Sequence, residues 1–258
     1  MPFDIQAARN FVKTADLTGT PRRLLAMDAA AETGTVFDQA KKQAQVVGAG
    51  VFSFAQGVDA TVREAISDSA LLAQLVANKK FDFSKNPREW FKAYASVLEN
   101  VGWTLQEGGW TDYSAVGTNV EVNDQILTVM TAILGPATTA LAIIKATVDA
   151  LKAMTPGSSW FTIFSRDSQK AKIARFQIGL VDKDPAGDVF VSLLACLIEA
   201  QDTITQLLFF KFSQANAKFS ANSSKVSIDR AAFTELGPSI RTKIHAYQAD
   251  YLSSIKDL

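Results

Sequence analysis

An apolar run over residues 189–198 constrains the fold of this chain more than any other stretch. Its alternating positions are apolar on both sets, and Ser192 alone interrupts it. A strand with one face in water would alternate between apolar and polar residues, so a strand here has to be covered on both faces. A buried helix would give the same pattern. We favour a strand, because residues 172–181 alternate in the manner of a strand and the turn-forming residues 183–187 separate the two segments.

The neighbouring segments predict a meander of about four strands. They are residues 158–165, 172–181, 189–198 and 206–212. After Phe219 we expect a loop over residues 221–225 and a short closing strand over 226–229.

Helical patterns lie before and after this meander. Residues 35–55 are typical of a helix as far as Gly48, Asp59 is a good N-cap, and Asn86-Pro87 predicts the start of a helix with a buried aromatic stripe. The stripe comprises Trp90, Phe91, Tyr94, Val97, Leu98 and Val101. From Asp229 we expect a short helix that ends at Gly237-Pro238, followed by a last helix.

Strands clustered between helices indicate an α+β fold rather than a doubly wound one. We therefore predict an antiparallel sheet of about four or more strands, covered by helices on both faces, in a single domain over residues 1–258. The glycine-rich segment 102–122 is expected to be a loop or irregular hairpin. Its Trp103, Trp110 and Tyr113 either anchor it to the core or insert into a bilayer interface, and anchoring is favoured.

Residues 125–144 carry no charge and are long enough to cross a bilayer. Gly135-Pro136 interrupts them and four threonines dilute them, so we favour a pair of buried helices or one kinked helix.

Composition excludes several function classes. The 26 basic and 26 acidic residues cancel, so we expect no nucleic-acid partner. One cysteine and one histidine exclude an intramolecular disulfide, a cysteine zinc cluster and a multi-histidine site, and we expect no metal. Residues 1–14 contain no continuous apolar segment of a secretory signal. The expected location is therefore the cytoplasm, or outside the cell without a classical signal peptide.

Two side chains are candidates for chemistry. Cys196 lies in the middle of the apolar run, where a thiol is either an inert part of the core or a site of S-acylation; an apolar setting disfavours a reactive thiolate. His245 is a candidate general base, although no Gly-x-Ser-x-Gly nucleophile motif accompanies it, and a surface position on the terminal helix is favoured.

The order of elements and the segment V-S-L-L-A-C-L-I-E-A, residues 191–200, resemble the Evf-like virulence factors of plant-associated enterobacteria. The fold of that family is similar to those of the cytolytic Cyt toxins and the fungal volvatoxins. The resemblance implies a cysteine that carries palmitate through a thioester, with the acyl chain buried in the protein, and Cys196 would hold that position.

The leading hypothesis is therefore a virulence-type protein that binds or covalently carries a fatty acyl chain, palmitate on Cys196, in an apolar cavity. The expected cavity residues are Phe190, Leu194, Ile198, Phe210, Trp90, Tyr94 and Leu134. Association with a host membrane is a further expectation. The alternatives are a Cyt-like membrane-permeabilising toxin, and an acyltransferase in which the Cys196 thioester is an intermediate.

Overall fold

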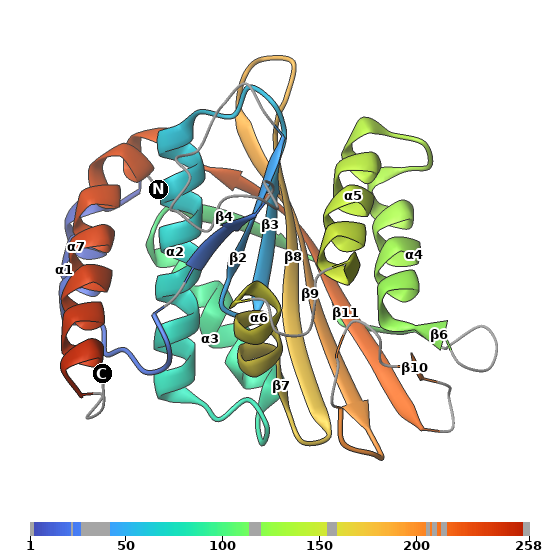
Figure 1. The fold of residues 1–258 in the computed structure, drawn as a ribbon. Coiled ribbons are helices and arrows are strands. Elements are labelled where there is room, and N and C mark those ends of the chain that lie inside the picture. The colour runs from blue at the N-terminus through green and yellow to red at the C-terminus, as the bar shows by residue number, and fades with distance from the viewer. Residues whose placement is uncertain are drawn as a thin grey trace.

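A mixed β-sheet forms the centre of the molecule (Figure 1). The structure is a computed structural model that describes residues 3–21, 23–26, 42–113, 120–153, 159–204, 207, 211–212 and 216–254. The main path of the sheet has the order β1 (Arg23–Ala26), β2 (Gln43–Val47), β3 (Gly50–Phe54), β8 (Ile173–Lys183), β9 (Val189–Ala200), β11 (Ala217–Ile228) and β4 (Trp103–Glu107). β5 (Thr111–Tyr113) pairs with β11, and β7 (Gln169–Lys170) pairs with β8. A separate pair joins β6 (Val120–Glu121) to β10 (Lys211–Phe212).

β9 lies in the interior of this sheet, between β8 and β11, and both of these strands are antiparallel to it. The prediction of an α+β fold is confirmed, and so is the strand over residues 189–198. The expectation that the sheet is purely antiparallel is wrong at one point, because β3 and β8 are parallel, with Val51 opposite Ile178.

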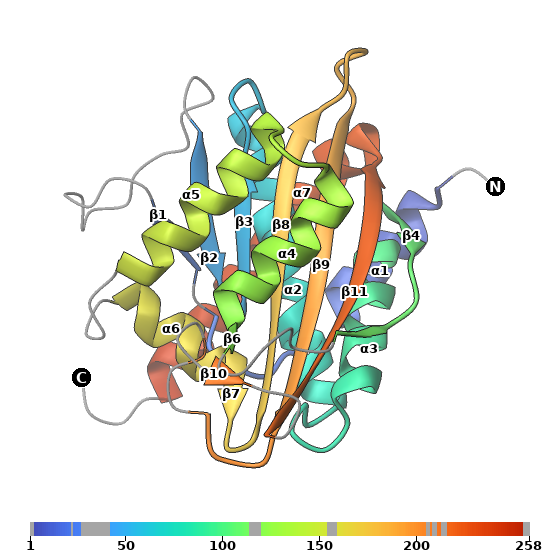
Figure 2. The ribbon, with the colours of Figure 1, turned by 90° about the vertical axis from the view of Figure 1, so that its right-hand side faces the viewer.

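Helices cover both faces of the sheet (Figure 1). One face packs against α2 (Ala60–Lys80) and α3 (Pro87–Asn100), and α1 (Ile5–Thr14) and α7 (Arg230–Ser254) lie outside α2. The other face packs against α4 (Val122–Leu134) and α5 (Thr139–Ala153), with α6 (Ser159–Ser168) beside them. In Figure 2, α4 lies in front of β8 and α5 in front of β2 and β3. We call these the α2/α3 face and the α4/α5 face. Cover on both sides explains why residues 189–198 are apolar at alternate positions of both sets.

Two contacts fix which side chains lie on which face. Ser53 in β3 contacts Thr147 of α5, whereas the neighbouring Phe54 lies under Arg63 of α2. Residues that pair across neighbouring strands have side chains on the same face, so the strand register assigns the residues of β8, β9 and β11 to one face or the other.

Two predicted elements are of the wrong type. The helix expected over residues 35–55 is instead, in its described part, the hairpin of β2 and β3, joined at Gly48 with φ +54°. Both strands are buried on both faces, so they lack the alternation that marks a strand. The strand expected over residues 158–165 belongs to α6, whose Phe164 packs edge-on against Phe176 of β8 at 6.1 Å between ring centroids. An aromatic segment fits a helix that caps a sheet as well as it fits a strand.

Three boundaries also differ. The loop expected over residues 221–225 lies within β11, where pairing with β9 and β4 holds a polar segment extended. α7 continues through Pro238, because Leu236, Ile240 and Ile244 remain buried on both sides of the proline. Of the strand expected over residues 206–212, the structure describes Leu207 outside any strand and Lys211–Phe212 as β10; the rest lies outside the described residues.

Candidate functional site

Cys196 lies in the middle of β9 on the α4/α5 face. Phe176 of β8 is opposite it on one side and Ala221 of β11 on the other. Its side chain is 0% exposed, and desolvation raises the pKa of the thiol well above its ordinary value. A buried thiol of this kind stays protonated, so Cys196 is not a nucleophile while the α4–α5 hairpin covers it.

The surroundings of Cys196 are apolar. Leu194 and Ile198 flank it along β9, paired with Ile178 and Ala174 of β8, and all of these are buried. Above them, α4 and α5 contribute buried apolar side chains to the same hydrophobic core: Ile126, Val129, Met130, Ile143, Ile144, Val148 and Leu151. Apolar side chains of the sheet and of these two helices therefore enclose the sulfur.

The structure brings together only part of the predicted cavity. Phe190, Leu194 and Ile198 share the face of Cys196, and Leu134 of α4 packs against the core that covers this face. Trp90 and Tyr94 belong to α3, on the opposite face of the sheet, so the sheet separates them from the sulfur. Phe210 lies outside the described residues.

The α4–α5 hairpin contains the uncharged residues 125–144. The expected pair of helices is present, but each helix is buried only on one side and exposed on the other, so the expectation of buried helices is wrong in that respect. Gly135, at φ +83°, ends α4, and Ile133 near this turn is 39% exposed. Two polar contacts hold the hairpin: Ser53 Oγ lies 2.8 Å from Thr147 Oγ1, and the Lys152 ammonium donates to Glu121 at 2.8 Å. None of the described helices combines the length and the apolar character that a membrane span requires.

A second group of side chains, on the α2/α3 face, was not expected from the sequence. Arg175 of β8 is 2% exposed, with its guanidinium carbon 3.5 Å from the ring centroid of Trp90 and 4.4 Å from that of Phe83. Burial lowers the pKa of Arg175 to about 9, an effect that Asp167 and Tyr94 partly oppose. The alternation of residues 172–181 puts Arg175 and Gln177 on the polar side of the strand, and α2 and α3 cover that side, in keeping with the expected helices on both faces. The sequence signal for this group was a charged residue, Arg175, in the middle of a strand, together with a helix rich in aromatic residues that could pack on it.

The remaining candidates have structural positions. His245 is exposed on α7. Trp103 is buried and donates through Nε1 to Ser69 Oγ at 3.0 Å, and the Trp110 ring lies 5.0 Å from that of Phe91. These aromatic residues therefore anchor their segment to the core, as favoured. No group of side chains in the described ranges could hold a metal ion.

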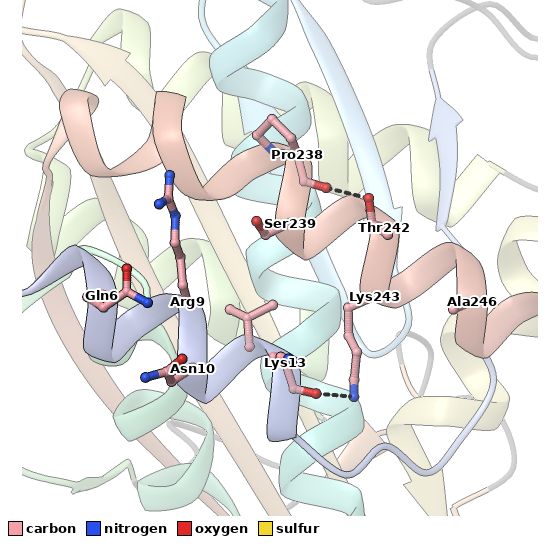
Figure 3. A pocket seen from close by; sticks show the side chains of 10 residues that line it. Gln6, Arg9, Asn10, Lys13, Pro238, Ser239, Thr242, Lys243 and Ala246 are labelled. Carbon is pink, nitrogen blue, oxygen red and sulfur yellow. Dashed lines mark hydrogen bonds between the residues drawn. The ribbon is translucent and has the colours of Figure 1, made fainter.

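A surface groove of about 620 Å³ runs between α1 and α7 (Figure 3). Arg9 on its wall pairs with Glu235 at 2.7 Å, and Lys243 donates to the backbone carbonyl of Lys13 at 3.0 Å. The second contact satisfies a carbonyl in the last turn of α1, so it stabilises the packing of α1 on α7. The groove is lined by Gln6, Arg9, Asn10, Val12, Lys13, Pro238, Ser239, Thr242, Lys243 and Ala246.

No protein-family model matches the chain, and neither does any curated protein. Among solved structures, it is similar to a delta-endotoxin, with 14% identity, 80% of this chain and 89% of the other covered, and a TM-score of 0.43. It is also similar to the Evf virulence factor, with 10% identity, 80% and 82% coverage and a TM-score of 0.35. For the activated Cyt2Ba monomer from Bacillus thuringiensis subsp. israelensis, identity is 13%, coverage 71% and 99%, and the TM-score 0.31. The structural neighbours of this chain thus include Evf and Cyt proteins, at TM-scores that support no conclusion about activity.

Proposed function

We propose that this protein carries a fatty acyl chain between its sheet and the α4–α5 hairpin, attached as a thioester to Cys196. The position of Cys196 supports this proposal most directly. It is a thiol at the centre of an apolar sheet face, covered by a hairpin that has no charge over residues 125–144. Burial of a methylene group contributes about 0.8 kcal/mol, so a C16 chain in this layer would gain on the order of 10 kcal/mol.

The covalent step requires an activated acyl donor, such as an acyl thioester of coenzyme A. The Cys196 thiol loses its proton, Sγ attacks the acyl carbonyl, and the donor leaves as a free thiol. Because the closed protein keeps Cys196 protonated and covered, acylation has to occur while the α4–α5 hairpin is away from the sheet. The hairpin then closes over the chain.

Intact-mass measurement of the protein from its native source tests this proposal. We expect a mass increase of one acyl chain that hydroxylamine removes and that Cys196→Ala abolishes. As a second measurement, the unmodified recombinant protein is incubated with palmitoyl-coenzyme A in mild denaturant and refolded. Acylation of the open protein and not of the closed one is expected. Absence of a hydroxylamine-labile adduct in both experiments would overturn the proposal.

A second candidate function is permeabilisation of membranes through the α4–α5 hairpin. It is favoured by the uncharged segment 125–144, which forms the greater part of α4, the turn and the start of α5, and by Ile133, which is exposed near the tip of the hairpin. For this function the hairpin would leave the sheet and contact lipid, so a covalent link between the hairpin and the sheet should prevent permeabilisation.

Ser53 and Thr147 offer the position for that link. Their oxygens lie 2.8 Å apart across the interface, so the two side chains point towards one another, as the sulfurs of a disulfide have to. In a Cys196→Ala background, Ser53→Cys combined with Thr147→Cys should block dye release from liposomes when oxidised and restore it when reduced. Each single cysteine variant is the matched control. Equal release by the oxidised and reduced double variants would exclude a role for hairpin opening.

A further inference from the structure

The two buried arginines among the described residues differ in how many of their guanidinium N–H groups donate hydrogen bonds. Arg63 is 0% exposed and donates from Nε to the Val58 carbonyl, from Nη2 to the Ala55 carbonyl and from Nη1 to Gln43 Oε1. Arg175 donates only from Nη2, to Asn78 Oδ1 at 3.0 Å; Nε and Nη1 have no partner among the described residues. Leaving a buried charge without a partner is strongly destabilising, so Arg175 calls for a counter-charge.

No described carboxylate lies within ion-pair distance of Arg175 to supply it. Asp167 affects the pKa of Arg175 electrostatically without forming a salt bridge with it. The guanidinium carbon lies 3.5 Å from the ring centroid of Trp90 and 4.4 Å from that of Phe83, and these ring contacts supply no hydrogen-bond acceptor for the N–H groups, which lie in the guanidinium plane. The missing partner therefore has to approach in the plane of the guanidinium.

Three further side chains with buried polar atoms that lack a partner lie on the same face; Gln177 and Tyr94 are buried, and Asn222 is partly exposed. Gln177 follows Arg175 by two residues along β8 and has no partner for either amide atom, and the Tyr94 hydroxyl of α3 has none. Asn222 of β11 has a buried Oδ1 without a partner. Gln177 and Asn222 both pair with Ala195 of β9 and so form one row across the sheet.

Ala195 shows where this group of side chains is open. It lies between Gln177 and Asn222 on a helix-covered face, and yet it is partly exposed, whereas Gln177 is 0% exposed. Buried polar atoms in native proteins are nearly always paired with protein, water or a ligand. The unpaired groups belong to Arg175, to Gln177 two residues along the same strand, and to Tyr94, whose ring stacks on the Trp90 that contacts Arg175. With a partly exposed small residue in the adjacent strand, they indicate a site rather than isolated packing defects.

We propose that the α2/α3 face holds a site for a small oxyanion, a carboxylate or a phosphate. Arg175 provides its counter-charge, and Tyr94 and Gln177 donate hydrogen bonds to it. Arginine and neutral N–H and O–H donors around one position match the acceptor oxygens of such a group. This site lies on the opposite side of the sheet from Cys196, so it is independent of the acyl-carrier proposal.

Thermal unfolding tests this site. The full-length protein is exchanged into sodium chloride and titrated with sodium acetate or sodium phosphate at constant ionic strength. We expect a saturable rise in melting temperature, and the two arms show whether carboxylate or phosphate is preferred. Arg175→Met should abolish the rise. Arg88→Met, which removes an exposed guanidinium on α3, should keep it.

Tyr94→Phe provides a second variant in case Arg175→Met does not fold, because it removes only the hydroxyl. It should weaken oxyanion binding about five-fold, in keeping with the loss of one hydrogen bond. If the site holds water alone, neither anion will raise the melting temperature beyond chloride. That result, or an unchanged response in Arg175→Met or Tyr94→Phe, would overturn the proposal. The same titration of Cys196→Ala should match that of the wild type, which separates this site from the acyl-carrier proposal.

Discussion

The hydrogen bond between Ser53 and Thr147 should make a measurable contribution to the attachment of the α4–α5 hairpin. Thr147 Oγ1 also lies 2.9 Å from the Ile143 carbonyl, which can only accept. Since a threonine hydroxyl has one proton, it goes to Ile143, and Ser53 is the donor in the 2.8 Å contact with Thr147. Both side chains are buried, so neither can replace the lost contact with bulk water.

This geometry gives different costs for the single and double variants. Thr147→Val keeps the shape of the side chain and leaves the buried Ser53 donor unsatisfied, which should cost about 1–3 kcal/mol in the free energy of unfolding. Ser53→Ala leaves only an acceptor lone pair unfilled and should cost about 0.5–1.5 kcal/mol. The double variant removes both polar groups and should lie within about 1 kcal/mol of the wild type, well below the sum of the single costs.

Urea unfolding of the wild type, the two single variants and the double variant, followed by circular dichroism, gives this cycle directly. The expected interaction energy is about 1–2 kcal/mol in the direction that favours the pair. Additive single effects, or a Thr147→Val protein as stable as the wild type, would refute the assignment of Ser53 as a buried donor. The position of the hairpin relative to β3 would then have to be revised.

Two further outcomes follow from local geometry. Gly179→Ala would place a Cβ 2.6 Å from Cδ1 of the buried Phe52 ring and should lower the free energy of unfolding by about 1–3 kcal/mol. Gly109→Ala is the control, because a Cβ there meets nothing within 4 Å and should change the free energy of unfolding little. Equal urea midpoints for the two variants would contradict this expectation. The hydrogen bond from Ser84 lowers the pKa of Asp82 from its ordinary 3.8 to about 2, so its contribution to stability is present above about pH 4 and is lost as the pH falls towards 2. Asp82→Asn should therefore flatten the loss of stability over this range, and parallel acid-unfolding curves for the two proteins would show that Asp82 is not involved.

Local sequence signals predicted the parts of the fold that local physics decides. Pro87 begins α3 and the aromatic stripe of this helix is buried, as predicted. A proline at the first helical position and apolar residues at helical spacing are signals that depend only on residues close together in the sequence. The break at Gly135-Pro136 separates α4 from α5 for the same reason. Apolar positions on both faces of β9 predicted cover on both sides, and that cover is present.

Parts decided by distant pairing could not be predicted in this way. β2 and β3 acquire strand structure from each other and from β8, and the polar centre of β11 is extended because β9 and β4 flank it. The candidate site was affected similarly. Trp90 and Tyr94 are apolar helix residues that could pack on either side of a doubly covered strand, and only the three-dimensional arrangement places them with Arg175 rather than with Cys196.

The parallel pairing of β3 with β8 has a consequence for the order of events during synthesis. β3 leaves the ribosome long before its partner β8, and every residue of α2 to α6 has to be made in between. Contacts this far apart in the chain form slowly, because a large loop has to close before they contribute. Until then one edge of β3 keeps unpaired backbone amides and carbonyls, the kind of edge to which other chains add. We therefore expect nascent chains that stop before residue 173 to depend on chaperones, and chains that include β8 and β9 to be released from them.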